Sequence, residues 1–404
     1  MPEVTLADVQ AARDRCSDES VVRTTPLERS RSLSSFSGGD VWLKMEHLQR
    51  TGSFKTRGAY NKLVQIADEF DRVVAASAGN HAQGVALAAT KVGVESTIVM
   101  PENAPQAKID ATRGYGATVV LEGHDFQAAL EHAQSLAADD DIAFIHAYDD
   151  PAIVAGQGTL GVEIHEKGPD IDTVVVPIGG GGLIGGVATA LKTLDPSIRV
   201  VGVQAKAAAT VPESLDKGFP VGIDDPRTIA DGIATGGIST LTFELIEEYV
   251  DEVVLVSDEQ IANATLLLLE RAKQLVEGAA AASVGALLSD ELDVTDETVV
   301  AVLGGGNIDI SMLQTVLTHA LSDREQLIRF RVRIDDQPGT MGELSSVIGD
   351  LGANIRSVRH DRAVEDLHVG EAYLVFEVTT SGAGHARNII DAIESRGYTV
   401  DRLI

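Results

Sequence analysis

The stretch TVVVPIGGGGLIGGVATALKTL, Thr173–Leu194, sets the fold class that we expect for this chain. Thr173–Ile178 is a short run of apolar, mostly β-branched residues that ends at glycine, which predicts a buried strand. Ile184–Leu194 is rich in alanine and leucine, which predicts a helix. A strand that leads through a glycine loop directly into a helix is the repeating unit of parallel α/β folds.

The same alternation of apolar runs and alanine-rich segments extends along most of the chain. The other predicted strands are Val73–Ser77, Ser96–Met100, Ala117–Leu121, Ala143–His146, Arg199–Gln204, Val253–Val256 and Thr298–Leu303. The predicted helices between them include His81–Val92 and Phe126–Ala138. The irregular spacing fits an α/β fold with two open, twisted, mostly parallel sheets better than eight equal barrel units.

The pattern changes near Gln326, after a predicted helix at Met312–Ser322. The predicted elements there are strand Leu327–Ile334, helix Met341–Leu351, strands Ala353–His360 and Glu371–Thr379, and helix Ala386–Arg396. This βαββα order predicts a separate ferredoxin-like α+β domain. We therefore expect a large domain over 1–320, with a smaller lobe at about 51–150, and a second domain over 327–404.

The composition narrows the class of function. The chain has 404 residues and a net charge of -29, from 61 acidic and 32 basic residues, and such a surface repels nucleic acid and anionic membranes. Because the acidic residues recur along the whole chain, we interpret them as a solubilising surface, by analogy with proteins of halophiles. Cys16 is the only cysteine and no secretory signal is visible, so we expect a cytoplasmic protein.

Two glycine-rich loops follow predicted strands. They are SAGNHAQG, Ser77–Gly84, and PIGGGGLIGG, Pro177–Gly186. Ligands of open α/β sheets bind at the edge where parallel strands end. Four successive glycines let backbone N–H groups converge on an anion, and the following helix adds its partial positive charge. The alternative is that the glycines only allow close packing between helix and sheet.

The tetraglycine loop does not match a nucleotide fingerprint. Its spacing resembles G-x-G-x-x-G, but the next strand ends in Val203-Gln204 rather than in an acidic residue. The chain also has no G-x-x-x-x-G-K-[ST] motif. A single phosphate monoester is therefore the simplest ligand for this loop.

A lysine in an unusual setting gives the second indication of a cofactor. TGSFKTRG, Thr51–Gly58, places Lys55 just before a helix predicted at Arg57–Gln65, where a positive charge is disfavoured. With partial burial, this setting lowers the pKa of the amine and favours a neutral nucleophile. A neutral amine forms a Schiff base with an aldehyde, and an aldehyde cofactor with one phosphate is pyridoxal phosphate. The alternative is an ordinary surface cation.

Five sequence blocks, in order, resemble the threonine dehydratases (threonine ammonia-lyases). These belong to the tryptophan-synthase-β-like pyridoxal-phosphate enzymes of fold type II. The blocks are EHLQRTGSFKTRGA (46–59), SAGNHAQG (77–84), YDDPAIVAGQGTLGVEI (148–164), GGGGL (179–183) and TIADGIA (228–234). Further along, DDQPGTMGEL (335–344) and GANIRSVRHDRA (352–363) resemble the ACT domain that ends one subgroup of these enzymes.

The resemblance assigns roles to individual residues. It implies that Lys55 holds pyridoxal phosphate covalently, that Asn80 hydrogen-bonds the phenolic oxygen of the ring and that Phe54 packs beside it. The backbone amides of Gly179, Gly180, Gly181, Gly182 and Leu183 would bind the phosphate. The loop carrying Ser77, Gly79 and His81 would hold the substrate carboxylate. Gly304 stands where the family usually has Ser, Thr or Cys bonded to the pyridine nitrogen, so we expect weaker ring anchoring or an altered rate.

The resemblance implies the deamination of L-threonine to 2-oxobutanoate and ammonia, with L-serine as a side substrate. Related serine racemases have a serine at the position of Ala78 and a carboxylate-lined metal site at the position of Gln204. Their absence here favours elimination over racemisation, and we expect no metal. The alternatives are serine racemase, serine dehydratase, hydroxyaspartate dehydratase and a non-catalytic amino-acid sensor.

For the second domain, the resemblance implies pairing with another copy, in a homodimer or homotetramer. It also implies binding of a regulatory amino acid, isoleucine or valine, as in isoleucine biosynthesis. The alternative is a dimerisation module that binds no ligand.

Overall fold

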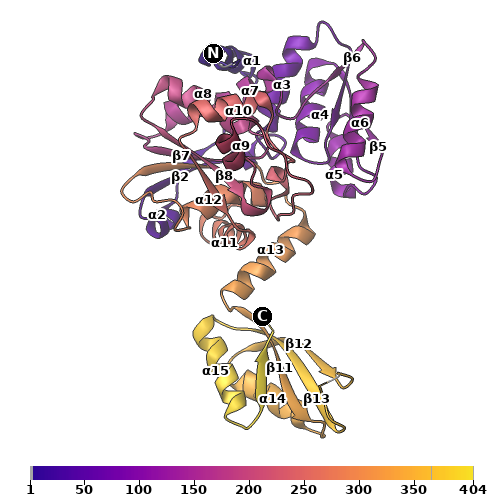
Figure 1. The fold of residues 1–404 in the computed structure, drawn as a ribbon, viewed down its shortest axis with the longest axis vertical. Coiled ribbons are helices and arrows are strands. Elements are labelled where there is room, and N and C mark those ends of the chain that lie inside the picture. Colours follow the sequence, from indigo (N-terminus) through magenta and orange to yellow (C-terminus); the bar gives the residue numbers. More distant parts are fainter. Residues whose placement is uncertain (1–2, 365, 404) are drawn as a thin grey trace. The chain divides into compact units, whose positions relative to one another are not determined.

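The computed structural model describes residues 3–364 and 366–403. It divides into two compact units, Met1–Asp309 and Ile310–Ile404 (Figure 1). Helix α13, Ile310–Asp323, belongs to the second unit. The sequence-based boundary fell later, between residues 320 and 327.

The first unit contains a six-stranded sheet in the order β1-β2-β10-β7-β8-β9. The strands are β1 Leu27–Arg29, β2 Asp40–Lys44, β7 Thr173–Pro177, β8 Arg199–Ala205, β9 Glu252–Val256 and β10 Thr298–Val302. All neighbours pair in parallel except β1, which is antiparallel to β2. The predicted strands of this region are present, whereas β1 and β2 were not predicted.

Helices cover both faces of this sheet (Figure 1). They are α1 Leu6–Arg15, α2 Arg31–Ser37, α7 Pro151–Lys167, α8 Gly182–Leu194, α9 Val211–Lys217, α10 Thr240–Tyr249, α11 Asp258–Leu267 and α12 Gly278–Leu287. Successive strand side chains point to opposite faces. Val175 of β7 thus packs in the core with α11 and α12, whereas Val174 and Val176 pack with α7 and α8. Burial on both faces explains the uninterrupted apolar runs of these strands.

A second, smaller sheet of the same unit has the order β5-β4-β3-β6, and all its pairs are parallel. Its strands are β3 Arg72–Ala76, β4 Glu95–Met100, β5 Thr118–Leu121 and β6 Ile142–Phe144. Its helices are α3 Lys55–Ile66, α4 Asn80–Val92, α5 Gln106–Gly114 and α6 Phe126–Leu136. Both sheets therefore have the open parallel architecture that the sequence predicts.

Helix α7 lies against both α3 and α8 through glycines. A Cβ atom on Gly58 of α3 would lie 2.6 Å from the carbonyl oxygen of Ile153 in α7. A Cβ atom on Gly186 of α8 would lie 2.3 Å from the carbonyl oxygen of Val154 in α7. These backbones approach too closely for any side chain. Contacts with α7 therefore set the positions of both α3, which carries Lys55, and α8, which follows the tetraglycine loop.

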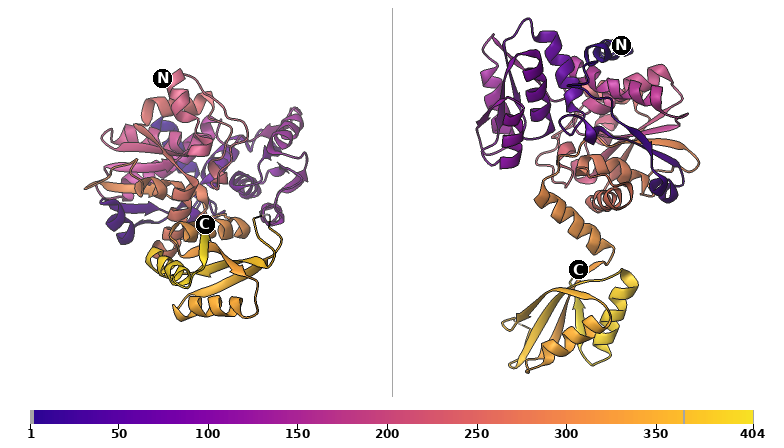
Figure 2. Two further views of the ribbon diagram at one scale, coloured as in Figure 1. Left: turned by 60° about the horizontal axis from the view of Figure 1, so that its bottom comes forward. Right: turned by 180° about the vertical axis from the view of Figure 1, so that it is seen from behind.

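The second unit has a four-stranded antiparallel sheet in the order β12-β13-β11-β14, with α14 and α15 on one face (Figure 2). Its elements are β11 Leu327–Asp335, α14 Thr340–Asp350, β12 Asn354–Asp361, β13 Glu371–Thr379, α15 Ala383–Glu394 and β14 Thr399–Arg402. The predicted βαββα order lacked β14. This strand is short and no residue in it is fully buried, so its sequence carries no apolar run that would reveal it.

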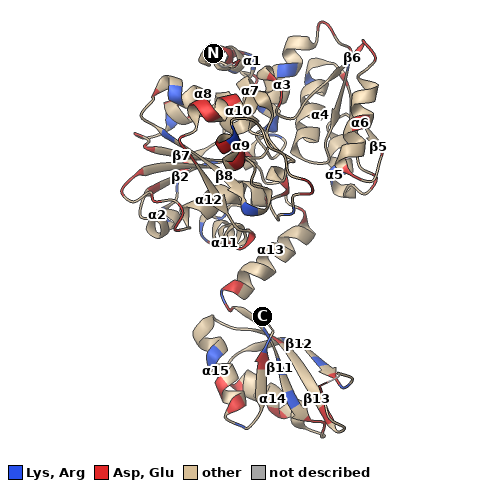
Figure 3. Ribbon diagram, in the orientation of Figure 1, with Lys and Arg blue, Asp and Glu red and all other residues tan. Residues whose placement is uncertain are grey.

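Acidic residues are spread over helices and loops of both units (Figure 3). No helix in the described part of the chain is long and apolar enough to cross a bilayer.

Candidate active site

The loop before α3 is held against the segment that follows β10. The N–H of Phe54 donates to the carbonyl oxygen of Gly304 at 3.1 Å, and Ser53 forms an isolated β-bridge with Gly305. Lys55 is the next residue and begins α3. The lysine therefore emerges at a helix N-terminus, beside a glycine segment at the end of a central strand.

The Lys55 amine is half-buried, and its Nζ donates a hydrogen bond of 3.0 Å to the carbonyl oxygen of Ala147. Burial lowers the pKa of Lys55 to about 8, while the charge of Glu277 opposes part of this shift. The shift has the direction that the sequence predicts. The neutral, nucleophilic amine is therefore populated as the pH approaches 8.

A buried network of four charged side chains fixes the start of α3. The Arg57 guanidinium bonds Glu46 Oε2 at 2.8 Å and Glu163 Oε1 at 2.7 Å, and Lys44 Nζ bonds Glu163 Oε2 at 2.6 Å. Burial alone raises the pKa of Glu163, but the charges and hydrogen bonds of Arg57 and Lys44 outweigh it and lower that pKa. Both carboxylates are thus paired, and the network joins β2, α3 and α7 two residues beyond Lys55.

Asn80, the first residue of α4, has an amide whose orientation is fixed on both sides. Its Oδ1 accepts a hydrogen bond of 2.8 Å from Asn307 Nδ2, which also donates to the carbonyl oxygen of Thr51 at 2.7 Å. Its Nδ2 lies 2.8 and 3.0 Å from the two carboxylate oxygens of Glu277. Residues from four separate parts of the chain therefore meet beside Lys55.

The loop Ser77–His81 combines an open position with a buried histidine. No atom of another segment lies within 4 Å of a Cβ built on Gly79, and the Gly79 N–H donates to Ser77 Oγ at 3.1 Å. His81 Nε2 donates to the carbonyl oxygen of Ile145 at 3.0 Å. Burial, and then the charge of Lys55, lower the pKa of His81 to about 3. His81 is therefore a neutral donor rather than a cation.

The tetraglycine loop forms the N-terminus of α8. Gly181 has φ +88° and caps the helix, and the Gly185 N–H donates to the Gly181 carbonyl at 2.8 Å. The amides before Gly185 have no acceptor in the helix and are available for an anion. A Cβ on Gly180 would lie 2.2 Å from the ring of Tyr148, which directly follows Ala147. The lysine and the glycine loop thus contact adjacent residues.

Gly304 also lies within this group of residues. A Cβ atom on Gly304 would lie 3.4 Å from Phe54 Cδ1 and 3.9 Å from Leu183 Cδ2. The fold therefore brings Phe54 and Gly304, which were predicted beside the ring, together with Leu183, which was predicted at the phosphate. A serine Cβ at this position would make ordinary van der Waals contact.

Gln204, at the end of β8, makes hydrogen bonds within its own loop. Its Oε1 accepts from the backbone N–H groups of Thr210 and Val211 at 3.1 and 2.9 Å, and so satisfies the N-terminus of α9. Gln204 is thus a neutral amide at the position where the resemblance to serine racemases implied a metal-binding carboxylate.

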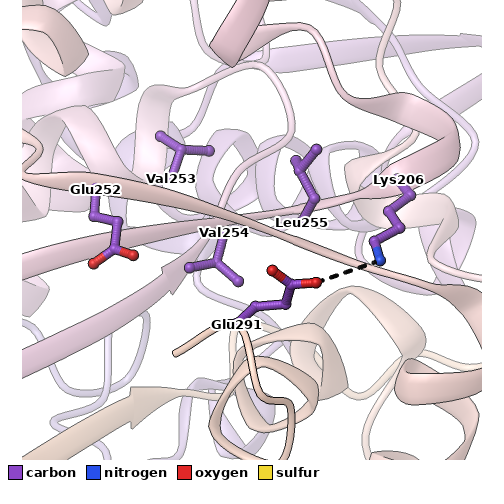
Figure 4. A pocket seen from close by; sticks show the side chains of 6 residues that line it. All are labelled: Lys206, Glu252, Val253, Val254, Leu255 and Glu291. Carbon is purple, nitrogen blue, oxygen red and sulfur yellow. Dashed lines mark ion pairs between the residues drawn. The ribbon is translucent and has the colours of Figure 1, made fainter. Parts of the chain in front are cut away.

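A surface pocket lies beside the edge strand β9 (Figure 4). It is lined by Lys206, Glu252, Val253, Val254, Leu255 and Glu291. Lys206 and Glu291 form an ion pair of 3.9 Å across it. None of the predicted site residues lines this pocket, so it is separate from the candidate active site.

Comparison with protein families gives one match that covers most of the chain. Residues 19–305 match the model described as "Pyridoxal-phosphate dependent enzyme". The chain belongs to this family. Its cofactor is therefore pyridoxal phosphate, in agreement with the sequence prediction.

Two relatives of this family member extend over nearly the full length of the chain. An L-threonine ammonia-lyase of Thermotoga maritima is 44% identical over 399 residues, which cover 98% of this chain and 99% of the relative. An L-threonine ammonia-lyase of Geobacter sulfurreducens is 42% identical and covers 98% of each chain.

Solved structures also resemble most of the chain in fold. Threonine deaminase isoform 2 from Solanum lycopersicum has a TM-score of 0.74 and 39% identity, covering 78% of this chain and 87% of that one. Maize serine racemase also has a TM-score of 0.74, with 32% identity, covering 80% of this chain and 99% of that one.

The site geometry of this pyridoxal-phosphate enzyme fits its cofactor. Gly180 and Gly181 form a cradle in which any Cβ would collide, at 2.2 Å from Tyr148 and 2.7 Å from Thr242. Ser53, next to Phe54, is fully buried, and its hydroxyl has no hydrogen-bond partner among the described residues. A phosphorylated aldehyde would fit three groups of this site: the anion cradle, the neutral amine and the buried hydroxyl that lacks a partner.

Sequence reasoning missed three residues of this site: Ala147, Glu277 and Asn307. Glu277 is the one charged residue in the apolar stretch VEGAAAAS, and an isolated charge there was an available signal. Asn307 ends the stretch GGGN, 304–307, in which only Gly304 was predicted as a site residue. Ala147 acts through its carbonyl oxygen, so its side chain gives no signal at all.

Removing Arg57 should expose the dependence of the fold on the buried network. In Arg57→Ala, the carboxylates of Glu46 and Glu163 lose their partner, and we expect a loss of about 3–5 kcal/mol in the free energy of unfolding. Urea unfolding followed by the fluorescence of Trp42, the only tryptophan and part of β2, reports on this unit.

Arg13→Ala is the matched control, because Arg13 pairs with Glu166 on the surface, with side chains 45% and 43% exposed. This change should cost less than about 1 kcal/mol. Equal losses in the two variants would show that the buried network has no special importance.

Proposed function

We propose that this chain is a threonine ammonia-lyase, which converts L-threonine to 2-oxobutanoate and ammonia by elimination and return of water. The half-buried Lys55, with its lowered pKa and its hydrogen bond to Ala147 beside the tetraglycine cradle, carries the proposal. The names of the full-length relatives support the choice of threonine. L-Serine, which differs by one methyl group, is the expected side substrate, because one methylene discriminates weakly.

Each side chain of the site has a proposed task. Pyridoxal phosphate supplies an aldehyde that reacts with amines and a ring that stabilises negative charge at the substrate Cα. The amides of Gly179–Leu183 hold its phosphate, and Asn80 and Phe54 hold its ring. Lys55, as a neutral amine, anchors the cofactor and removes the α-proton. Neutral His81 and the loop from Ser77 to Gly79 orient the substrate carboxylate.

We propose that proton transfer takes place on one face only. Lys55 supplies the base on its face, and Ala78 has no group that exchanges a proton on the other. A racemase needs a base on each face. The likeness to maize serine racemase therefore supports a common fold rather than a common reaction.

A substrate comparison tests the proposed reaction. The full-length chain should form 2-oxobutanoate from L-threonine faster than pyruvate from L-serine, as followed by the absorbance of the 2-oxo acid hydrazones. Lys55→Ala should lose at least a thousandfold in kcat, because both the anchor and the base are removed. Lys62→Ala, on the same helix but in an ion pair with Asp150, should keep normal turnover.

The same assay, with chiral chromatography of the serine reaction beside it, distinguishes the alternatives. Formation of D-serine without 2-oxo acid would identify a racemase, and preference for threo-3-hydroxyaspartate would identify a different dehydratase. A chain that binds pyridoxal phosphate but forms no 2-oxo acid from any of the three would contradict the proposal in favour of a sensor.

Gly304 offers a gain-of-function test at the ring. Gly304→Ser adds a hydroxyl beside Phe54, where the pyridine nitrogen is expected. One added hydrogen bond of about 0.5–1.5 kcal/mol should tighten cofactor binding about two- to thirteenfold. The dissociation constant comes from titrating the cofactor-free chain with pyridoxal phosphate and following absorbance. Gly114→Ser, in an exposed turn of α5 with no neighbour within 4 Å, is the control. Unchanged affinity in Gly304→Ser would refute this assignment.

We further propose that the second unit is an ACT domain that regulates the first, in a homodimer or homotetramer. Its βαββαβ order and the DQPG turn before α14 support the proposal. The turn ends at Gly339, which has φ +101° and is the N-cap residue of α14. An amino-acid carboxylate binds well at such a helix start.

Isoleucine or valine should then change the KM for L-threonine in the full-length chain. Gly339→Ala strains a left-handed position, and this response should weaken. Gly349→Ala, in the last turn of α14 with no neighbour within 4 Å, should respond as the parent chain does. If neither amino acid changes KM or the oligomeric state, the unit is a dimerisation module without a ligand.

A further inference from the structure

Glu277 occupies a position that its own helix does not explain. It is the N-cap residue of α12, yet its side chain makes no capping hydrogen bond to that helix. Its N–H donates to the carbonyl oxygen of Gly305 at 3.1 Å. A Cβ on Gly305 would lie 2.4 Å from Glu277 Oε1, and one on Gly232 would lie 3.1 Å from it. The carboxylate therefore fits into a slot that glycines keep open from two sides.

Both oxygens of this carboxylate are directed at a single group. They lie 2.8 and 3.0 Å from Asn80 Nδ2. Because Asn307 donates to Asn80 Oδ1, the amide of Asn80 cannot flip without losing hydrogen bonds on both sides. Glu277 thus fixes the Asn80 amide with Oδ1 toward Asn307 and Nδ2 toward the carboxylate. This orientation sets which edge of the amide is left for a ligand.

The charged groups around Glu277 come from several elements. Burial, together with Asp231, which begins the 3-10 turn Asp231–Ile233, raises its pKa. The hydrogen bond from Asn80 and the charges of Lys108 of α5 and Lys55 of α3 lower it by less, so the net shift is a rise. The charge of Glu277 acts on Lys55, and the charge of Lys55 helps to lower the pKa values of the buried His81 and His146. Glu277 is therefore the carboxylate whose charge opposes the lowering of the Lys55 pKa.

We propose that Glu277 is a positioning residue with two tasks: it orients Asn80 toward the cofactor ring, and it supplies the counter-charge of Lys55. The proposal rests on the proposed function only in placing the ring beside Asn80. It accounts for the slot between Gly232 and Gly305, which a residue that merely caps α12 would not need.

Two substitutions separate the two tasks. Glu277→Gln keeps an oxygen that accepts a hydrogen bond from Asn80 but removes the charge. Glu277→Ala removes both. A charge effect should appear in both variants, whereas an effect on Asn80 should appear mainly in Glu277→Ala.

The charge of Lys55 is measured without turnover. The full-length chain, freed of cofactor, is labelled briefly with acetic anhydride at a series of pH values, and mass spectrometry gives the modified fraction of Lys55. A carboxylate favours the ammonium form, so Glu277→Gln should shift the half-labelling pH downward by about one unit. Glu291→Gln, the same change beside β9, should leave it unmoved. No shift in Glu277→Gln would overturn the counter-charge role.

The orientation of Asn80 is measured by a double-mutant cycle on the affinity for pyridoxal phosphate. Glu277→Ala and Asn80→Ala should each weaken binding about tenfold, and the double variant should be no weaker than Asn80→Ala alone. Glu277→Gln should bind within about threefold of the parent chain. Additive losses would overturn the positioning role. Neither measurement uses threonine, so a chain that passes both yet deaminates nothing would refute only the proposed function.

Discussion

The buried ion pair between Arg57 and Glu46 is the constraint on which the site depends. These residues lie at the two ends of the loop that contains Lys55, and their contact at 2.8 Å closes that loop. Glu163 of α7 and Lys44 of β2 complete the network, so the loop is fixed to the larger sheet and to the helix between the two sheets. A buried charge that is left unpaired is costly. The loss of any one of these side chains would therefore leave its partners unpaired and destabilise the whole network.

This rigid base explains how a lysine can remain half-buried and still reactive. The amine gains one hydrogen bond, to a backbone carbonyl, and Glu277, whose charge acts on it, is already bonded to Asn80. Burial thus lowers the pKa of Lys55 and raises that of Glu277, opposite shifts that bring both groups closer to neutrality. The strong ion pairs lie two residues further along α3, at Arg57, where they hold the backbone but do not pair with the amine of Lys55.

The sequence predicted most of the architecture, because the central strands are buried on both faces and their apolar runs are unambiguous. It missed β1, β2 and β14, whose residues are partly exposed or interrupted by charges such as Asp40 and Lys44. Side chains inside recognisable motifs, such as Lys55 and Asn80, were predicted as site residues. Contacts made by a backbone carbonyl, as at Ala147, depend on tertiary packing and leave no trace in residue type.

The glycines of the site show why its parts are interdependent. Gly305 leaves room for the Glu277 carboxylate, and Gly180 leaves room for the Tyr148 ring. The residue before Tyr148 holds the amine of Lys55, and the carboxylate of Glu277 holds the amide of Asn80. Each glycine therefore leaves room for a residue that in turn helps to hold Lys55 or Asn80. A side chain added at Gly180 would displace the Tyr148 ring and, through the neighbouring Ala147 carbonyl, the amine of Lys55. A side chain added at Gly305 would collide with the Glu277 carboxylate and would also lie 3.0 Å from Asn80 Nδ2.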